Sequence, residues 1–403
     1  MKKQHIHANI HFYLSVLIAF LLPLARYVPV IIILLTLNWL IEGDFKAKLK
    51  KIAASKIALV FILFYILHLL GLLYTANMRS GNFDIQVKLS LLIFPLLYTS
   101  RPLANKQVQQ VFIALICGSL LCSALLLIHA VSSYYTTGEN NFFYEAFTNH
   151  VIHPSYLAMY LNVAVCWLLI QLKKNSQELG RFTIILSLLI IFYFTFILVL
   201  LSSKLGLLTL VLICFSALIY YSCKNYKAGI AGIILTIVAG LAIIKFVPAV
   251  SNRIQVAAEA LMAPTTNNTD AESTAVRMLI WKAANQVIAE NLLIGVGTGD
   301  AKDELIKEYE RRGMTGAIKN QLNAHNEFYQ VFVSIGLLGF LVFCIQLIVP
   351  LIVSIKEKNA IYTFFIIIMI LNFLTESMLE AEAGVMFYAF FNSVLCFTFI
   401  PHK

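Results

Sequence analysis

The sequence predicts an all-α polytopic membrane protein, and three observations support this fold class. Hydrophobic residues make up 60% of the 403 residues, and charged residues make up only 12%. Soluble domains contain roughly 25% charged residues, so this chain cannot cover a globular surface with them. Apolar stretches recur along nearly the whole chain, and the Lys and Arg behind the net charge of +10 fall mainly in the short loops between them. This distribution favours a lipid bilayer over nucleic acid as the partner.

Twelve stretches are apolar enough to be transmembrane helices, which need about 20 residues each. The first, second and fourth are short, and the first two could form one re-entrant hairpin. The stretches cover residues 11–25, 27–41, 56–74, 86–100, 108–131, 154–172, 182–201, 204–221, 228–248, 326–353, 360–377 and 384–400. They predict a bundle of about nine helices in residues 1–248, a helical loop domain in 249–325 and about three helices in 326–403.

The loops alternate in charge, and this alternation predicts the orientation of the chain. Loops such as "KAKLKKIAASK" and "LKKNSQELGR" are rich in Lys and Arg, whereas "SSYYTTGENNFFYEAFTNHVIH" and "ESMLEAEAG" contain none. Basic loops stay in the cytoplasm. We therefore expect both termini to be cytoplasmic and the loop of residues 249–325 to lie on the opposite face.

This long loop has the pattern of a small helical cap. Seven apolar residues recur at the i, i+3, i+4, i+7 spacing of an amphipathic helix: Val276, Leu279, Ile280, Ala283, Ala284, Val287 and Ile288. A glycine-rich stretch, "GVGTG", follows and we expect it to separate this helix from a second, polar one that ends at Gly313. No strand precedes the glycines, so a dinucleotide site is not indicated.

Neither a metal nor a cofactor is expected. The seven cysteines lie in or beside apolar runs, and no CxxC pair occurs, so neither a disulfide framework nor a zinc site is indicated. Glu376 and Glu380 share a helical face and could hold a divalent ion. Solvated charge is the better interpretation of these two residues.

His325 is the first candidate for chemistry, because it stands at the mouth of a long apolar run. If Asn323 caps the helix, His325 lies in the first turn and Gly336 lies three turns below it on the same face. A neutral imidazole could serve as a general base. A histidine that only caps the helix fits the spacing equally well.

Other polar residues collect on the predicted outer face. Lys204 and Arg277 could bind an anion, although Lys204 could snorkel to water and Arg277 could stack on Trp281 or pair with Asp270 or Glu272. Arg79 and Lys88 are further cations that could help to bind the substrate, as could Asn326, and Lys88 could sit beside a lipid headgroup. His153 and Tyr156, in "HVIHPSY", are expected to contact either their own loop or the acceptor, rather than a metal.

At His325 the sequence resembles bacterial O-antigen ligases. His325 and Asn326 are followed after nine residues by Gly336 and after two more by Gly339, and "AVRMLIWKAANQVIAENLLIGVGTG" resembles the segment before that histidine. The superfamily also includes O-antigen polymerases and protein O-oligosaccharyltransferases. The resemblance implies a metal-independent glycosyltransferase of the GT-C type, whose donor is a glycan on undecaprenyl diphosphate and whose acceptor is lipid A-core.

The resemblance also implies roles for single residues. His325 would be the essential histidine, and Arg277 the outer-loop arginine that binds the donor diphosphate. Lys204 stands where the ligases commonly have arginine. It keeps the positive charge but lacks the planar guanidinium group with which arginine binds phosphate through two hydrogen bonds. We expect His325, Arg277 and Lys204 to meet at the extracytoplasmic rim of the membrane.

Three other functions compete with a ligase. A polymerase would join one lipid-linked repeat to another, and its loss would leave single repeats. A protein O-oligosaccharyltransferase would modify Ser or Thr, and its loss would remove glycoproteins. A lipid-linked glycan transporter is more distant, because transporters often have two related halves whereas the halves of this chain look unlike.

Overall fold

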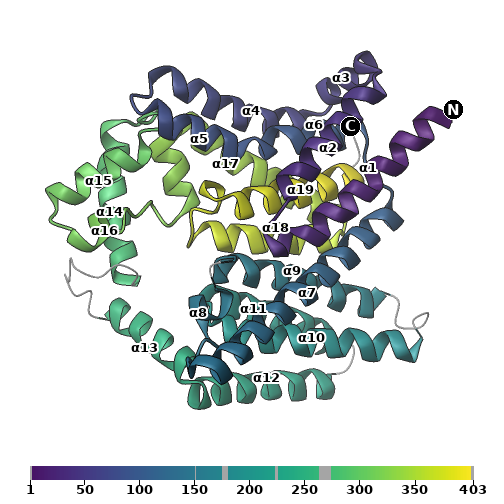
Figure 1. The fold of residues 1–403 in the computed structure, drawn as a ribbon, viewed down its shortest axis with the longest axis vertical. Helices are drawn as coiled ribbons and strands as arrows, with labels where there is room; N and C mark the ends of the chain where they lie inside the picture. Colours follow the sequence, from purple (N-terminus) through teal and green to yellow (C-terminus); the bar gives the residue numbers. More distant parts are fainter. Residues whose placement is uncertain (1, 150, 175–179, 223–225, 263–273, 401–403) are drawn as a thin grey trace. The chain divides into compact units, whose positions relative to one another are not determined.

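The computed structural model describes residues 2–149, 151–174, 180–222, 226–262 and 274–400. All regular elements in these ranges are helices (Figure 1). Nine of the described helices are long and apolar enough to cross a membrane, or ten if one bent pair counts as a span. The chain is therefore an all-α polytopic membrane protein. The count of twelve stays a prediction, as do the domain boundaries near residues 248 and 325.

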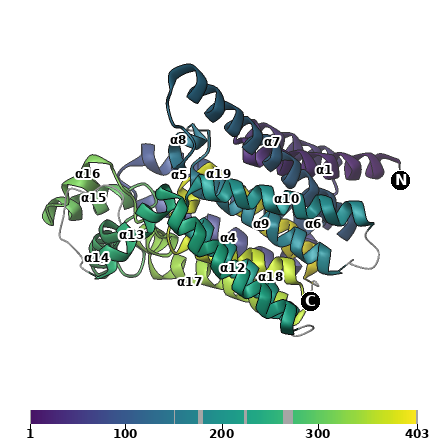
Figure 2. The same cartoon turned by 90° about the horizontal axis from the view of Figure 1, so that it is seen from below.

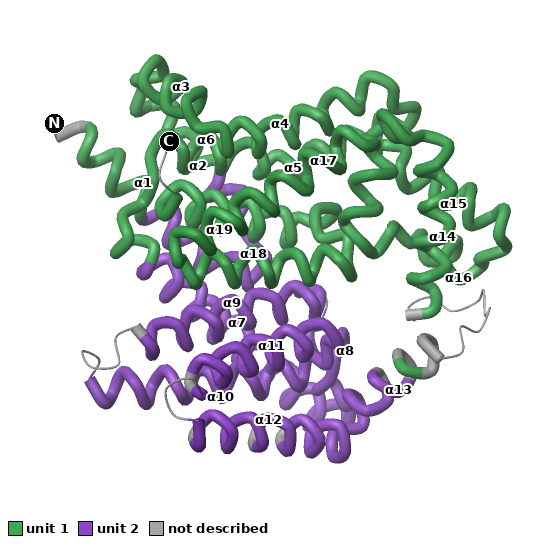
Figure 3. The backbone as a smooth tube through the Cα atoms, turned by 180° about the vertical axis from the view of Figure 1, so that it is seen from behind, with its two compact units in different colours: residues 1–12, 33–108, 256–403 green, residues 13–32, 109–255 purple. Residues whose placement is uncertain are grey.

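The chain packs as two compact units (Figure 3). Unit 1 comprises residues 1–12, 33–108 and 256–403, and unit 2 comprises residues 13–32 and 109–255. Four of the described helices contribute residues to both units: α1 (Lys2–Leu21), α2 (Val28–Glu42), α7 (Asn105–Thr137) and α13 (Pro248–Met262).

Unit 1 holds both N-terminal and C-terminal parts of the chain. Its transmembrane part has α17 packed on α4 and α18, and α19 packed on α6. The Phe343 ring lies 5.4 Å from those of Phe64 and Phe373, which themselves belong to α4 and α18. The elements of this part are α3 (Phe45–Ala54), α4 (Lys56–Gly71), η2 (Leu72–Tyr74), α5 (Met78–Lys88), α6 (Ser90–Ser100), α17 (Glu327–Lys356), α18 (Ala360–Phe373), η3 (Met378–Glu380) and α19 (Glu382–Phe399).

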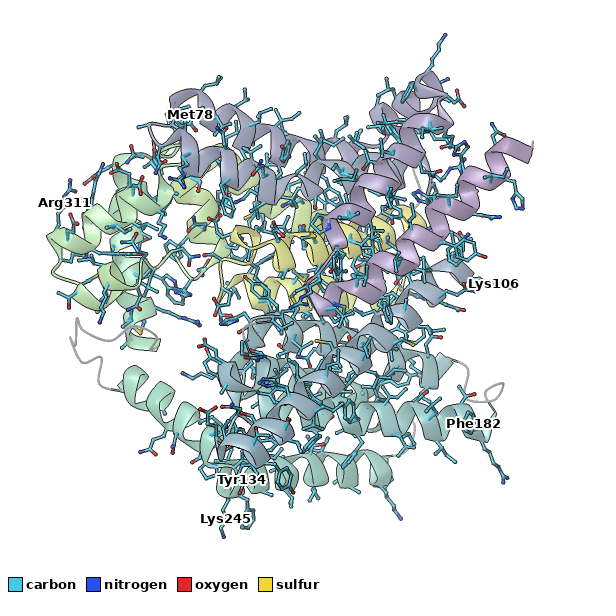
Figure 4. All side chains as sticks on the ribbon, in the orientation of Figure 1. Met78, Lys106, Tyr134, Phe182, Lys245 and Arg311 are labelled. Carbon is cyan, nitrogen blue, oxygen red and sulfur yellow. The ribbon has the colours of Figure 1, made fainter. Side chains whose placement is uncertain are left out.

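The cap of unit 1 consists of α14 (Thr274–Glu290), α15 (Ala301–Arg311) and α16 (Thr315–Lys319). The predicted apolar face of α14 is confirmed, because five of its seven residues are buried in the core of the cap and Leu279 and Ile288 pack against that core. Leu305 and Tyr309 of α15 face the same core. Arg311 of α15 and Met78 of α5 are labelled at this end of unit 1 in Figure 4.

Helix α17 is broken at the glycine of the sequence pattern. Ile335 and Gly336 have non-helical backbone angles, and Gly336 has φ 64°. Residues 291–297, which we call the docking segment, supply hydrogen bonds at the break: Val296 N–H to the Val333 carbonyl (2.9 Å), Gly297 N–H to the Ser334 carbonyl (3.0 Å) and Leu337 N–H to the Leu292 carbonyl (2.9 Å). The prediction that Gly336 lies on a continuous helix below His325 is therefore wrong.

The glycine-rich stretch joins the cap to the transmembrane helices. Besides the bonds at the break, the Thr298 hydroxyl donates to the carbonyl of His68 (2.6 Å), and the Asp300 carboxylate accepts from the backbone of Ala76 and Asn77 (2.7 Å each). The stretch also separates α14 from α15, as predicted. It is thus a structural joint that holds the cap on the bundle.

Unit 2 is a bundle in which α9 packs on both α10 and α11, and α11 packs on α12. Figure 2 shows α7 extending to the loop that carries α8. The elements of the unit are η1 (Leu22–Leu24), α7 (Asn105–Thr137), α8 (Tyr144–Thr148), α9 (Pro154–Lys174), α10 (Arg181–Leu201), α11 (Lys204–Ser222) and α12 (Tyr226–Phe246).

Candidate functional site

His325 lies in a short turn before α17, rather than in its first helical turn. The N-terminal capping residue of helix α17 is Asn326, whose side-chain oxygen accepts from the backbone N–H groups of Phe328 and Tyr329. The Asn323 side chain instead accepts from the His325 N–H (3.0 Å). The prediction that Asn323 caps the helix is therefore wrong, and Asn326 has a structural role at the helix start.

The His325 ring belongs to a chain of three side chains from distant parts of unit 1. Its Nδ1 lies 3.2 Å from Oε2 of Glu376, and Oε1 of the same carboxylate accepts from Arg277 Nη2 at 2.6 Å. The side chains of His325, Glu376 and Arg277 are 21%, 18% and 33% exposed. The site is thus partly shielded from water and still reachable from outside.

This arrangement defines the chemistry of the imidazole. When Nδ1–H donates to an ionised Glu376, the second nitrogen, Nε2, carries the lone pair. A carboxylate that holds one ring nitrogen fixes the tautomer and the orientation of the ring, as the carboxylate does in serine protease triads. The Nε2 atom of His325 can then accept a proton.

The turn before α17 is held from the cap as well. Trp281, one turn after Arg277 on α14, donates from its indole N–H to the carbonyl of Ala324 (3.0 Å) and stacks on the ring of Tyr329 (6.0 Å between centroids). Trp281 therefore holds the start of α17 through both its indole N–H and its ring. Asp270 and Glu272, the acidic residues with which Arg277 could pair, lie outside the described residues.

Residues 374–381, which we call the connecting segment, link α18 to α19 and carry Glu376. The Asn326 side chain donates to the carbonyl of Leu374 (3.0 Å), and the Asn326 N–H donates to the Ser377 hydroxyl (3.2 Å). Glu327 accepts from the N–H of Leu379 (2.8 Å). The start of α17 therefore holds the connecting segment at three points.

Lys88 and Arg79 differ in their surroundings. The side chain of Lys88 is 1% exposed and donates to the carboxylates of Asp84 and Glu380, the latter at 2.7 Å. The expectation of a position beside a lipid headgroup is therefore corrected, because Lys88 is enclosed by protein. Arg79 lies exposed in the first turn of α5.

Lys204 belongs to unit 2, where it begins α11. The Ser203 hydroxyl accepts from the Gly206 N–H (3.2 Å), and the Asn162 side chain of α9 donates to the Gly206 carbonyl (2.9 Å). An added Cβ at Gly206 would meet Ala158 of α9 at 2.6 Å. The start of α11 therefore lies against the N-terminal half of α9, and the role of Lys204 stays a prediction.

His153 and Tyr156 lie at the start of α9, in the same unit as Lys204. The His153 side chain is 38% exposed, with Nε2 3.8 Å from Glu145 and the ring 5.9 Å from that of Tyr156. Within the described residues, no group of three or more His, Cys, Asp or Glu side chains is arranged to hold a metal ion. A contact of His153 and Tyr156 with the acceptor stays a prediction.

Glu376 is the residue that the sequence interpretation missed, because its acidic neighbours predict a solvated loop. The only signal in the sequence is its position at the end of the apolar stretch 360–377, where an ionisable group is costly and tends to be functional. Its partners lie 51 and 99 positions away in the chain. No local spacing rule could pair them.

One family of known proteins matches part of the chain. Residues 187–344 match the sequence model of a family described as O-antigen ligase. The matched range contains Lys204, Arg277 and His325, whereas Glu376 and Lys88 lie outside it. No curated protein matches the chain. The match covers less than half of the chain, and it supports a relationship of this multi-pass membrane protein to the O-antigen ligase superfamily.

Proposed function

We propose that the protein transfers a glycan from undecaprenyl diphosphate to lipid A-core, or to a related acceptor, on the periplasmic face of the inner membrane. It would thus act as an O-antigen ligase. The observation that carries this proposal is the chain of contacts from Arg277 through Glu376 to His325. It combines a base, a carboxylate that orients the base and a cation in one partly buried site.

The reaction assigns a task to each group. His325 Nε2 takes the proton of the acceptor hydroxyl. At the same time the oxygen of that hydroxyl bonds to the anomeric carbon of the donor sugar. The bond between that carbon and the diphosphate oxygen breaks, and undecaprenyl diphosphate leaves with the electron pair. Glu376 keeps Nδ1 protonated and stabilises the imidazolium that forms.

The leaving diphosphate needs positive charge. Arg277 has five N–H donors, so it can bind a phosphate oxygen while one amino group contacts Glu376. Lys204 is proposed as a second cation for the same donor, on the basis of the sequence pattern. Cations aimed at charge that develops in the transition state are among the largest sources of rate enhancement.

The test is transfer by the purified protein from a defined undecaprenyl diphosphate glycan, with a chelator present. Three acceptors are offered separately: lipid A-core, a second molecule of the lipid-linked repeat, and a Ser- or Thr-containing peptide. Mass spectrometry then identifies the product. We expect glycosylated lipid A-core.

Each other product contradicts the ligase assignment. A lengthened lipid-linked chain would identify a polymerase, and a glycopeptide would identify a protein oligosaccharyltransferase. Movement of the lipid-linked glycan across the liposome membrane, without glycosyl transfer to any acceptor, would identify a transporter. Inhibition by the chelator would contradict metal independence.

A further inference from the structure

A group of ionisable residues, two of them buried and two partly exposed, lies in unit 1 beside the site. We call it the ion cluster, and its members are Asp84, Lys88, Glu327 and Glu380. Lys88 donates to Asp84 and to Glu380, and Glu327, which is fully buried, accepts from the backbone of Leu379. His68 flanks the cluster, with Nδ1 3.7 Å from Asp84.

Such a cluster is expensive inside a membrane protein. An ionisable group within a transmembrane segment is a candidate for function, with its charged neighbours as partners. Removing Lys88 leaves the carboxylates of Asp84 and Glu380 without their shared cation, which is destabilising. Lys88 is the only ammonium among three carboxylates in this group, so its loss would disturb all of its neighbours.

The ion cluster is connected to His325 by two routes. One runs through the connecting segment: Glu380 is bound to Lys88, and Glu376, four residues earlier, is bound to His325. The other runs through the start of α17, where Glu327 holds Leu379 and the adjacent Asn326 N–H donates to Ser377. Both partners of the contact between His325 and Glu376 are therefore fixed to elements that the cluster holds.

We propose that Lys88 is a positioning residue, which anchors the connecting segment through Glu380 and so sets the contact between Glu376 and His325. This proposal rests on the proposed function for its kinetic consequence, but the positioning itself can be measured without transfer. It replaces a role for Lys88 in binding the donor. The ammonium is 1% exposed and is already engaged by two carboxylates.

Unit 1 contains a matched control for Lys88. Lys48 of α3 is also buried, with a side chain 7% exposed, and pairs with Glu42 at 2.9 Å. It also donates to the carbonyl of Trp39. α3 precedes the start of α4, whereas the docking segment and Thr298 lie at the end of α4. Lys48→Met thus removes a buried lysine and its ion pair at the opposite end of the same helices.

The experiment compares Lys88→Met, Lys48→Met, Glu380→Ala and Glu380→Gln in the full-length protein. The first readout is the rate at which diethyl pyrocarbonate acylates His325, followed by peptide mass spectrometry. Loss of an oriented hydrogen bond to the ring should change this rate about threefold or more. We expect that change in Lys88→Met and Glu380→Ala, as in a Glu376→Ala reference, and not in Lys48→Met.

The second readout is transfer kinetics. A misplaced base lowers kcat roughly tenfold to a hundredfold, with little change in the donor KM because ground-state binding is retained. Glu380→Gln keeps an oxygen that accepts from Lys88, so it should keep most of the activity that Glu380→Ala loses. The comparison of Glu380→Ala with Glu380→Gln tests the positioning role of Lys88 even if Lys88→Met does not fold.

Three results would overturn the proposal. The first is equal acylation of His325 in Lys88→Met and Lys48→Met, and the second is equal loss in Glu380→Ala and Glu380→Gln. The third is a raised donor KM with unchanged kcat, because it would return Lys88 to donor binding. Absence of transfer by the wild-type protein would instead contradict the proposed function, and the acylation rates would still test the positioning.

Discussion

At His325 the backbone has φ 44°, in the left-handed region that residues other than glycine seldom adopt. Strain of this kind costs of order 1 kcal/mol and persists only where the surroundings impose it. Here the Asn323 side chain binds the His325 N–H, and Trp281 holds the preceding carbonyl of Ala324. The strained turn points the imidazole at Glu376 instead of continuing α17.

A substitution of Glu376 tests the role of single residues in the site. In Glu376→Gln the amide can no longer act as an ionised partner for Nδ1–H, so the tautomer with the lone pair on Nε2 loses its support. We expect kcat to fall roughly a hundredfold or more, measured as transfer to lipid A-core. Glu382→Gln, at an exposed carboxylate at the start of α19, is the control and should be near wild type. Equal activity of the two variants would refute the role of Glu376.

The sequence predicts part of this site. A histidine at the mouth of an apolar run and an arginine beside the apolar stripe of α14 are local patterns, so His325 and Arg277 could be found. The link between them could not, because it depends on Glu376, which the fold brings in from the segment between α18 and α19. For the same reason the burial of Lys88 could not be read from its sequence neighbours.

At the scale of elements, the break in α17 is the feature that positions the cap. Backbone groups at a break inside a membrane must find partners within the protein, and the docking segment supplies them. The sequence pattern, which includes Gly336 and Gly339, predicts the helix. It does not predict the break, because the partners at Leu292, Val296 and Gly297 come from about 40 positions earlier.

Gly336→Ala tests this joint. An added Cβ would lie 2.4 Å from the carbonyl oxygen of Leu293, and the φ of 64° is unfavourable for alanine. We expect a loss of roughly 2 kcal/mol or more in the free energy of unfolding in detergent. Gly240→Ala in α12 is the control, because nothing lies within 4 Å of its added Cβ and alanine favours a helix by up to about 1 kcal/mol. A stable Gly336→Ala would contradict the tight joint.

Tyr309 tests the core of the cap. Its hydroxyl is buried without a hydrogen-bond partner in the described part of the chain, and burial raises the pKa of its phenol above the ordinary value. Tyr309→Phe should therefore raise the free energy of unfolding by roughly 1 kcal/mol. Tyr362→Phe should lower it, because that hydroxyl donates to Asn392 (2.8 Å). Tryptophan fluorescence during unfolding measures both.

The same hydroxyl gives a dependence on pH. Because the pKa of Tyr309 is raised in the folded state, the unfolded chain releases the phenol proton first as the pH rises. Stability is then lost above pH about 10. Tyr309→Phe should lose less stability over that range, and an identical loss in both proteins would contradict the assignment.

At the scale of the whole molecule, composition predicts a membrane protein, because a chain with so few charges must bury its surface in lipid. The length of the recurring apolar stretches predicts that it is all-α. The number of spans is harder to predict. α11 and α18 are short apolar helices, and α2 and α3 meet at a bend of 113°. Hydropathy reports the length of an apolar run, whereas a crossing also depends on tilt and on neighbouring helices.

The orientation in the membrane gives a prediction at this scale. Lys302 and Lys319 are exposed on the cap, and Lys46 and Lys50 are exposed on α3. With the cap in the periplasm, a membrane-impermeant amine reagent should label Lys302 and Lys319 in spheroplasts. Lys46 and Lys50 should react only after permeabilisation. Peptide mass spectrometry measures both, and the reverse pattern would place the site in the cytoplasm.

The central claim is that His325 takes the proton of the acceptor hydroxyl. The most direct measurement is the rate of a single transfer from a defined undecaprenyl diphosphate glycan by His325→Ala. His129→Ala, at an exposed histidine of α7, is the control. The claim predicts a loss of roughly 10² to 10⁴ in rate for His325→Ala and near wild-type transfer for the control. Undiminished transfer by His325→Ala would contradict it.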